Sequence, residues 1–254
     1  MIELTDLVVT FRSKRATTTA LDGITLTVAP GELVTIVGPS GCGKSTLLKI
    51  VAGLVRPTSG AVSLMGREVN GPEKQIGFVF QRAALLEWRS ARKNILLQAE
   101  MRGMDRVLAA KRTDELIELT GLTGFEKALP HELSGGMQQR VALCRALLHQ
   151  PRVLLMDEPF GALDALTRES LNEELNRIWR ETGTTILLVT HSIAESVFLG
   201  TRVVVMSRRP GKIIKTLEVD LPRERRYAEV MSDSRFDRLA ASIRGLLGSN
   251  NGGG

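Results

Sequence analysis

The sequence predicts an α/β fold with a mainly parallel sheet, an antiparallel β subdomain and an inserted helical lobe. Nearly continuous apolar runs, typical of strands buried on both faces of a parallel sheet, occur at residues 33–38, 152–157 and 184–190. Apolar and polar residues instead alternate at 2–9 and 23–28, which favours strands with one buried and one solvent-facing side. Helical patterns separate the apolar runs, as expected for βα units.

The length and composition indicate one globular domain. The 254 residues are 43% apolar, which is enough to offset the entropy of the chain. Within a domain spanning 2–247, we expect a core with the β subdomain at 1–81 and 151–221, a helical lobe at 82–150, and a C-terminal helical extension at 222–247. The glycine-rich end, 248–254, is expected to be a disordered tail.

Two helices are expected within the lobe. The first covers 105–120 and is ended by Gly121, and the apolar residues available for its buried stripe are Val107, Leu108, Ala110, Leu116 and Leu119. The second follows Ser134, and the residues that can share its apolar face are Val141, Cys144, Leu147 and Leu148.

The net charge of +6 is concentrated near the C-terminus, where residues 202–226 hold eight basic and three acidic side chains. A solvated, charged surface is one interpretation, and contact with anionic lipid headgroups is another. Nucleic acid is not expected as a partner, because no aromatic residues are interleaved with these charges.

The cysteines and the N-terminus indicate the cellular setting. Cys42 and Cys144 match no metal-binding spacing, so a reducing cytosol is expected. The first ten residues include Glu3 and Asp6 and do not resemble a signal peptide. No apolar run approaches the roughly 18 residues that cross a bilayer. Any role at a membrane would therefore depend on a partner subunit.

Residues 38–45, GPSGCGKS, fit the phosphate-binding pattern G-x-x-x-x-G-K-[ST] between a buried strand and a helical stretch. The glycines let backbone N–H groups converge on phosphate oxygens, and the helix directs its positive end at the same place. Lys44 can reach the outer phosphates, and the Ser45 hydroxyl can ligate Mg²⁺. The chain is therefore expected to bind and hydrolyse Mg-ATP. The ATP-binding residues would be Gly38, Pro39, Ser40, Gly41, Cys42, Gly43, Lys44, Ser45 and Thr46. Cys42 is either a small filler or a redox switch.

Polar side chains end three further strand-like runs. Asp157 and Glu158 are neighbours on a strand and point to opposite faces, so Asp157 suits binding to Mg²⁺ and Glu158 suits polarising the attacking water. His191 ends another strand, where it could touch the γ-phosphate. The Gln81 amide could bond the attacking water or Mg²⁺. An acidic strand end capped by a turn and a hydrogen-bonded histidine are the structural alternatives.

The motifs GPSGCGKS, VFQ, LSGGMQQR, LLMDEP, GALD and VTH follow one another in this order, and together they resemble the nucleotide-binding subunit of ABC transporters over residues 2–215. The resemblance implies that the signature motif of a second subunit completes the ATP site through Ser134, Gly135, Gly136 and Gln138. Asp164 resembles an aspartate at that dimer interface. Phe11 would stack on adenine, although a core phenylalanine is the alternative. The resemblance also identifies Gln81 as the glutamine that joins the core to the lobe. The catalytic residues would then be Glu158, His191, Lys44 and Gln81, and the magnesium residues Ser45, Gln81 and Asp157.

The resemblance further implies a homodimer, transmembrane permease subunits, an extracytoplasmic solute-binding protein, and a peripheral location on the cytoplasmic face of the inner membrane. Stretches 80–94, 157–168 and 203–213 look like bacterial importers of the nitrate/sulfonate/taurine group, so the expected solute is an anion of this type or a related small organic compound. Three residues depart from that group: Glu87 replaces proline, Ser192 replaces aspartate and Cys144 replaces alanine. An ATPase acting on DNA or ribosomes and an exporter subunit are the rival functions.

Overall fold

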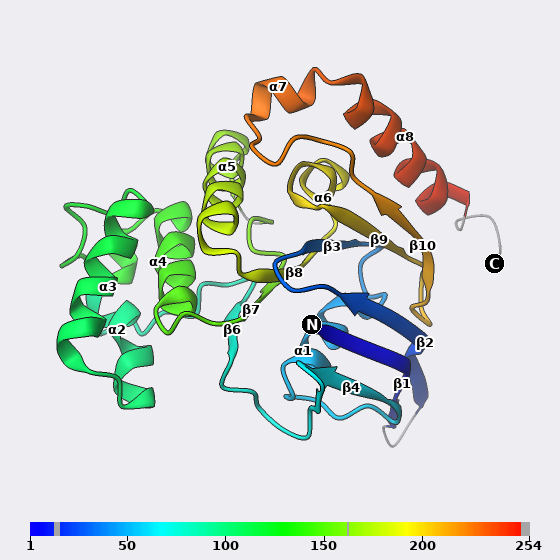
Figure 1. The fold of residues 1–254 in the computed structure, drawn as a ribbon, viewed down its shortest axis with the longest axis horizontal. Coiled ribbons are helices and arrows are strands. Elements are labelled where there is room, and N and C mark those ends of the chain that lie inside the picture. Colours follow the sequence, from blue (N-terminus) through cyan, green and yellow to red (C-terminus); the bar gives the residue numbers. More distant parts are fainter. Residues whose placement is uncertain (13–15, 162, 250–254) are drawn as a thin grey trace.

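The computed structural model describes residues 1–12, 16–161 and 163–249, whose strands form two sheets flanked by helices (Figure 1). The larger sheet has the strand order β10–β9–β3–β8–β7–β6, and the smaller has the order β2–β1–β4–β5. Within the larger sheet only β10 is antiparallel to its neighbour among the described strands. The predicted α/β fold with a mainly parallel sheet is confirmed.

The larger sheet forms the centre of the molecule. Its strands are β3 (Leu33–Val37), β6 (Ile76–Val79), β7 (Val153–Asp157), β8 (Thr185–Thr190), β9 (Arg202–Met206) and β10 (Ile213–Glu218). Every residue of β3, β7 and β8 is buried, which confirms the three apolar runs. Val34 and Ile36 belong to the hydrophobic cluster that contains helix α1 (Lys44–Val51) and the smaller sheet. Leu33 and Val37 belong to the cluster on the other face, with helices α5 (Ala165–Thr182) and α6 (Ile193–Leu199).

The smaller sheet is antiparallel. Its strands are β1 (Ile2–Arg12), β2 (Thr17–Val28), β4 (Ser59–Leu64) and β5 (Arg67–Glu68). In β2 the alternation holds as predicted: Ile24, Leu26 and Val28 are buried, while Thr25 and Thr27 are exposed. The pairing of β1 with β2 brings Phe11 opposite Thr18 at the far end of the hairpin.

Helices α2 (Ala91–Arg102), α3 (Arg106–Leu119) and α4 (Gly135–Leu147) lie together at the left of Figure 1, and a short 3-10 helix (Pro130–Glu132) precedes α4. The helix expected at 105–120 is present, and its predicted stripe is confirmed at Leu116 but wrong at Val107 and Leu108. Val107 and Leu108 are 76% and 66% exposed. The buried residues are Ala109, Thr113, Leu116 and Ile117. These follow i, i+4, i+7 and i+8 spacing, so one narrow face of α3 packs and the first turn projects into solvent.

Helix α4 begins and packs as predicted. The Ser134 hydroxyl accepts a hydrogen bond from the backbone N–H of Met137, which satisfies one of the free donors at the helix start. The predicted apolar face is confirmed, because Val141, Cys144, Leu147 and Leu148 are all buried.

The C-terminal part forms helices α7 (Tyr227–Met231) and α8 (Ser234–Ser249), which run along the outer edge of the molecule (Figure 1). The tail predicted to begin at 248 is wrong at its first two positions, because Gly248 and Ser249 are the last residues of α8. The rest of that predicted tail, 250–254, lies outside the described residues. Among the described helices, none has the length and apolar character to span a bilayer.

Six of the eight basic residues in the segment 202–226 are exposed, as the solvated interpretation predicts. Arg202 lies 2.8 Å from the carboxylate of Glu32, and Lys212 lies 2.7 Å from that of Asp22. Arg225 is only 4% exposed, so the solvated interpretation is wrong for this residue.

Arg225 stabilises the end of helix α6. Its guanidinium donates hydrogen bonds to the carbonyls of Val197, Phe198, Gly200 and Pro222. Burial lowers the pKa of Arg225 to about 10, which leaves the side chain charged at neutral pH. The positive charge at the C-terminal end of α6 also complements the helix dipole.

We predict that Arg225→Ala destabilises the fold by about 2–4 kcal/mol, because it leaves buried carbonyls without donors. Arg226→Ala is the matched control, since the Arg226 side chain is 73% exposed; it should change stability by less than about 0.5 kcal/mol. Urea unfolding of the three proteins measures the difference. Equal stabilities for the two variants would contradict the role of Arg225.

Candidate nucleotide-binding site

The glycine-rich loop joins the end of β3 to the start of α1, as the sequence predicts. Gly41 and Gly43 have φ of +75° and +103°, a conformation that side chains rarely adopt. A Cβ at Gly43 would lie 2.6 Å from Leu21 Cδ2 and 2.9 Å from the Ala20 carbonyl. The loop can therefore take this shape only with glycine at position 43.

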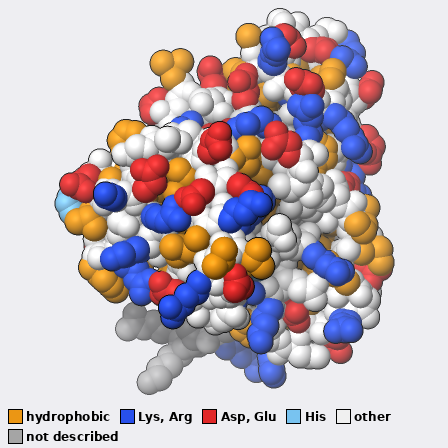
Figure 2. All heavy atoms as spheres, turned by 60° about the vertical axis from the view of Figure 1, so that its left-hand side comes forward, with side chains coloured by type: hydrophobic (Ala, Val, Ile, Leu, Met, Phe, Trp, Pro, Cys, Tyr) orange, Lys and Arg blue, Asp and Glu red, His pale blue; other side chains and the backbone are white. Residues whose placement is uncertain are grey.

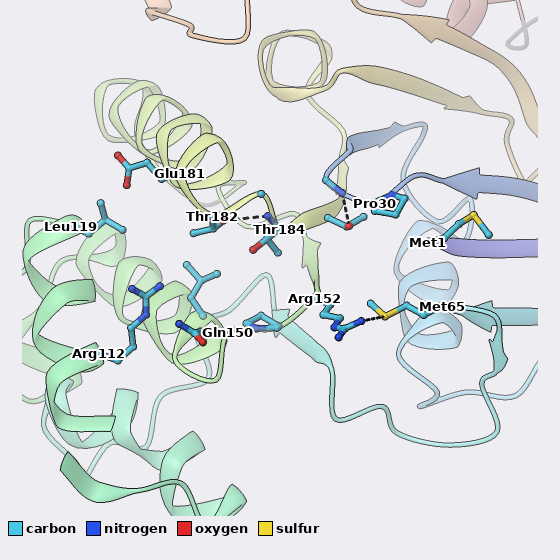
Figure 3. A pocket seen from close by; sticks show the side chains of 15 residues that line it. Met1, Pro30, Met65, Arg112, Leu119, Gln150, Arg152, Glu181, Thr182 and Thr184 are labelled. Carbon is cyan, nitrogen blue, oxygen red and sulfur yellow. Dashed lines mark hydrogen bonds between the residues drawn. The ribbon is translucent and has the colours of Figure 1, made fainter. Parts of the chain in front are cut away.

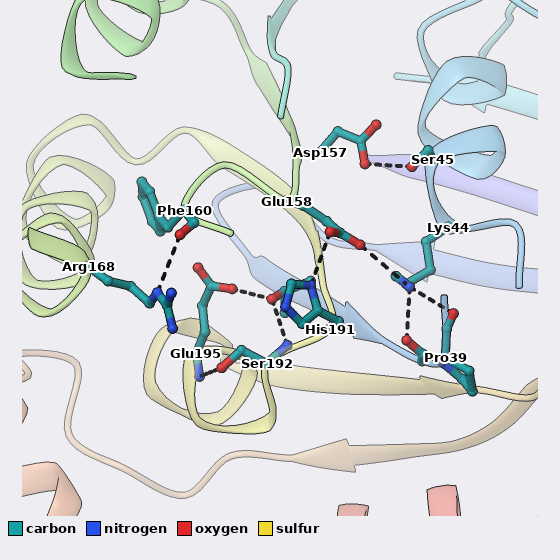
Figure 4. A network of polar contacts seen from close by, with 12 residues as sticks. Pro39, Lys44, Ser45, Asp157, Glu158, Phe160, Arg168, His191, Ser192 and Glu195 are labelled. Atoms are coloured by element: carbon teal, nitrogen blue, oxygen red, sulfur yellow. Dashed lines mark hydrogen bonds and ion pairs between the residues drawn. The ribbon is translucent and has the colours of Figure 1, made fainter. Parts of the chain in front are cut away.

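Lys44 is the first residue of α1, and its side chain extends back into the glycine-rich loop. Its side chain is 4% exposed, and Nζ donates to the carbonyl oxygens of Gly38 and Pro39 at 2.9 and 3.0 Å. The same Nζ lies 3.8 Å from Glu158 Oε1 (Figure 4). The loop thus presents an ammonium group next to a carboxylate from another strand.

Ser45 and Asp157 bring two oxygen groups that could bind a metal together beside the loop. The Ser45 hydroxyl donates to Asp157 Oδ1 at 2.7 Å (Figure 4). Burial raises the pKa of Asp157, and the hydrogen bond from Ser45 opposes that rise. Hard oxygen ligands of this kind suit Mg²⁺, which is usually held by one or two carboxylates together with substrate phosphates. The described residues contain no cluster of three or more His, Cys, Asp and Glu that could hold a metal on its own.

Glu158 follows the last residue of β7, so the alternation of a strand that the sequence predicts for Asp157 and Glu158 does not set its direction. Its Oε2 lies 3.1 Å from His191 Nδ1, so residues following β7 and β8 meet (Figure 4). Glu158 has φ of +45°, which is uncommon for a residue with a side chain. The hydrogen bond from its N–H to the Val189 carbonyl, 2.9 Å long, holds this conformation.

Lys44, Ser45 and Glu158 share one cavity of about 390 Å³ with the end of the β1–β2 hairpin, whereas Asp157 and His191 are not among its lining residues. The residues that line it are Phe11, Thr18, Ala20, Ser40, Gly41, Gly43, Lys44, Ser45, Thr46, Glu158 and Arg209. Phe11 is 48% exposed, which excludes the alternative of a core phenylalanine. Cys42 is 1% exposed and burial raises the pKa of its thiol, as fits a small filler rather than a redox switch.

The structure does not bring the signature residues into this cavity. Gly135, Gln138 and Gln81 line a neighbouring groove instead, with Glu87 at its edge. The Gln138 amide donates to the carbonyls of Pro130 and Leu133 within its own segment. Within a single chain, Gln81 and the signature motif are thus apart from Lys44 and Glu158.

Two further predicted residues lie where α4 and α5 meet. A Cβ at Gly136 would lie 2.4 Å from Thr167 Cγ2, so the start of α4 packs directly on the first turn of α5. Asp164 caps α5 by accepting a hydrogen bond from the Thr167 N–H at 3.0 Å.

Gln139, which sequence analysis did not single out, connects three segments near the site. Its side-chain amide donates to the carbonyls of Phe80, Gln81 and Pro159. The residue is 5% exposed. No local pattern marks this role, because the three acceptors are backbone atoms distant in the sequence.

A buried polar group behind His191 was also missed (Figure 4). Glu195 is 3% exposed, and its Oε2 accepts a hydrogen bond from the Thr190 hydroxyl. Its other carboxylate oxygen is buried with no partner in the described chain. Ser192 caps α6 by accepting from the Glu195 N–H at 3.2 Å. The Ser-x-x-Glu spacing indicates the start of a helix, but the Ser192 N–H donates to the Thr190 hydroxyl, so this spacing does not predict the burial of Glu195.

Arg168 is a second polar residue close to Glu195. Its guanidinium donates to the carbonyls of Phe160 and Leu163, in the segment that follows Glu158 (Figure 4). Its charge favours the ionised form of Glu195 and so opposes the effect of burial on the pKa of that carboxyl.

A larger cavity, of about 900 Å³, lies away from these residues (Figure 3). Its lining includes Pro30, Arg152 and Thr184, which adjoin the N-terminal ends of β3, β7 and β8. In open parallel sheets ligands bind at the carboxyl ends of strands. Cavity size therefore does not identify the functional site here.

On the face shown in Figure 2, basic and acidic side chains are intermixed with small apolar groups.

Comparisons with known proteins agree with these motifs. Residues 21–161 match the sequence profile of the family described as ABC transporter. The chain is 50% identical to the taurine import ATP-binding protein TauB of Pelagibacter ubique (strain HTCC1062), over 82% of this chain and 78% of that protein. It is 51% identical to the aliphatic sulfonates import ATP-binding protein SsuB of Bacillus subtilis (strain 168), over 82% of this chain and 81% of that protein.

A solved structure is also similar. It is the dimeric post-hydrolysis state of the ATP-binding cassette MJ0796 bound to ADP and Pi. The TM-score is 0.77 at 32% sequence identity, and the match covers 87% of this chain and all of that one.

Glu195 generates a pH-dependent prediction. Burial raises the pKa of Glu195 to about 7 from an ordinary value of 4.5, against the opposing hydrogen bond from Thr190. The fold therefore favours the protonated carboxyl, and this contribution is lost as the pH rises from about 4.5 through 7. Glu195→Gln should be more stable than the native protein at pH 8, by at most about 3 kcal/mol, and the gain should vanish toward pH 4.5.

Urea unfolding at the two pH values measures this difference. Glu118→Gln, at an exposed position of α3, is the control and should change the stability by less than about 0.5 kcal/mol at either pH. If Glu195→Gln is less stable than the native protein at pH 8, Arg168 and His191 stabilise the ionised carboxylate instead.

Proposed function

The chain belongs to the ABC transporter family of ATP-binding proteins, and from this we propose that it is the ATP-hydrolysing subunit of a bacterial importer for a small anion. Its ATPase activity follows from the family. Sulfonates and taurine are the proposed class of substrate, because two similar proteins are named as taurine and aliphatic sulfonate import proteins. Nitrate-type anions fall within the same proposal.

The observation that carries the proposal is the meeting of Lys44, Glu158 and His191 at the carboxyl ends of three adjacent parallel strands. Phosphoryl transfer needs mainly positioning and charge stabilisation. Lys44 and the loop N–H groups hold the phosphates, and Phe11 at the far end of the cavity stacks on the adenine. Glu158 accepts a proton from the attacking water, and His191 orients that carboxylate and faces the γ-phosphate.

Ser45 and Asp157 would hold Mg²⁺, whose positive charge would offset that of the phosphates. Gln81 is proposed as a further ligand, but its place in the neighbouring groove means that it must approach from outside the cavity. This movement of Gln81 would link binding of the nucleotide to the position of the segment between the core and the helical lobe.

A second subunit is proposed to complete each site. Ser134, Gly135, Gly136 and Gln138 lie outside the cavity of their own chain, and the start of α4 is a suitable anion site because of its free N–H groups. In a head-to-tail homodimer the signature motif of one chain would close on the ATP of the other. Asp164, at the exposed start of α5, would lie at that interface.

The permease is proposed to bind the groove lined by Gln81, Leu85 and Glu87. Trp88, next to this groove in the sequence, is 77% exposed and offers an apolar contact. The protein would then lie peripherally on the cytoplasmic face of the inner membrane, with a solute-binding protein acting on the far side. The proposal of an importer rather than an exporter or a DNA-directed ATPase is supported by the import proteins named above.

Complementation tests the shared site. Lys44→Ala and Ser134→Ala should each abolish hydrolysis in homodimers. A mixture should recover activity, at most roughly a quarter of the native rate, because one site of each mixed dimer has both native residues. Steady-state ATP hydrolysis before and after mixing measures the recovery. If the signature motif acts on the ATP of its own chain, every site stays defective and mixing restores nothing.

Stimulation by solute tests the importer function. The chain, purified with its permease subunits in lipid vesicles, should hydrolyse ATP faster when a solute-binding protein loaded with taurine or an alkanesulfonate is present. A binding protein loaded with a sugar is the control. Stimulation of hydrolysis by DNA, or none by any loaded binding protein, would contradict the proposal.

A further inference from the structure

The turn between β9 and β10 packs against the phosphate loop. This turn, residues 207–212, is held to β2 by hydrogen bonds from the Gly211 N–H to the Ala20 carbonyl and from the Asp22 N–H to the Gly211 carbonyl, 2.9 and 3.1 Å long. A Cβ at Gly211 would lie 2.1 Å from the Cys42 carbonyl oxygen. The turn therefore lies between the β subdomain and the loop with no space between them.

One side chain of this turn reaches the phosphate loop directly. The Nε and a terminal nitrogen of Arg209 donate to the Gly41 carbonyl at 3.2 and 3.1 Å. Arg209 also lines the cavity that contains Phe11 and Lys44. The turn is fixed by the ion pair of Lys212 with Asp22, whose nitrogen and oxygen are 2.7 Å apart.

The Gly41 carbonyl is a sensitive point of the loop. Gly41 lies in the left-handed region at φ of +75° and has no side chain, so its peptide groups can rotate at little steric cost. Phosphate binding needs backbone N–H groups directed into the cavity, and a carbonyl turned inward would repel the phosphate oxygens. The two donors of a planar guanidinium hold the carbonyl in one direction.

We propose that Arg209 is a positioning residue for nucleotide binding, which fixes the Gly41 carbonyl away from the phosphates and adds positive charge at the rim of the cavity. This inference depends on the proposed role of the cavity as the nucleotide site. In the sequence Arg209 belongs to a charged segment and lies 168 residues after Gly41, so no local pattern indicates this contact.

The role predicts a particular pattern of binding. The glycine-rich loop holds the α- and β-phosphates, whereas Lys44 reaches the outer ones. Loss of Arg209 should therefore lower the affinity for ATP and the affinity for ADP by the same factor. Once ATP is bound, Glu158 and His191 are unaffected, so kcat should stay the same and KM should rise.

Three variants of one turn test the role. Arg209→Ala should raise the Kd for MgATP and MgADP by roughly three- to tenfold. Arg209→Lys retains the positive charge but not the planar guanidinium that donates two hydrogen bonds, and it should recover part of the nucleotide affinity. Arg208→Ala is the matched control, because its side chain is exposed and has no hydrogen bond or ion pair with the described residues. It removes the same charge from the same turn and should leave Kd unchanged.

Calorimetric titration with each nucleotide, ATPase kinetics and the Tm without nucleotide are the measurements. The proposal is overturned if Arg209→Ala leaves Kd unchanged, if Arg208→Ala has an equal effect, or if kcat falls while KM does not change. A lowered Tm that Arg209→Lys fully restores, with no change in Kd, would also overturn it. Lys44→Ala separates the two levels of inference. If Lys44→Ala binds ATP normally, the cavity is not the nucleotide site. If Lys44→Ala loses ATP binding while Arg209→Ala keeps it, the cavity is the nucleotide site and only the role of Arg209 is wrong.

Discussion

The parallel pairing of β3, β8 and β7 is the constraint on which the site depends. Val37 at the end of β3 pairs with Thr190, and Val189 pairs with Asp157. Three chain segments therefore leave the sheet at the same edge, and each contributes one part of the site: the phosphate loop, the carboxylates and His191. Since all residues of these strands are buried, the edge is held by the hydrophobic core on both faces of the sheet.

Within this edge, charge and backbone geometry are closely combined. One carboxylate, that of Glu158, contacts both the ammonium of Lys44 and the ring of His191. Its positive φ directs the side chain into the cavity, and the surrounding hydrogen bonds hold the residue there at the cost of backbone strain. Behind His191, Glu195 occupies a position where burial raises the carboxyl pKa and so opposes ionisation. The site thus retains a strained residue and a partly unpaired carboxyl, both of which a purely structural core would avoid.

The sequence predicted those features that depend on local patterns. Strand burial, the loop conformation and the place of Asp157 and Glu158 at the end of a buried strand follow from residue types a few positions apart. The stripe of α3 was wrong at Val107 and Leu108 because several apolar residues could face the core, and only packing against α2 and α4 decides which do. Arg209, Arg225 and Gln139 could not be predicted, because each donates to backbone carbonyls that every sequence has. Such contacts leave no pattern in residue types and appear only when the chain is folded.

The buried amide of Gln139 has a mechanical consequence. It joins the backbone at Phe80 and Gln81 to the backbone at Pro159, next to Glu158. The same residue belongs to helix α4, whose first turn carries the signature motif. Through this one side chain, the start of α4, the backbone at Gln81 and the segment that follows Glu158 are joined to one another. If one of these segments is displaced, the others must move with it or these hydrogen bonds must break.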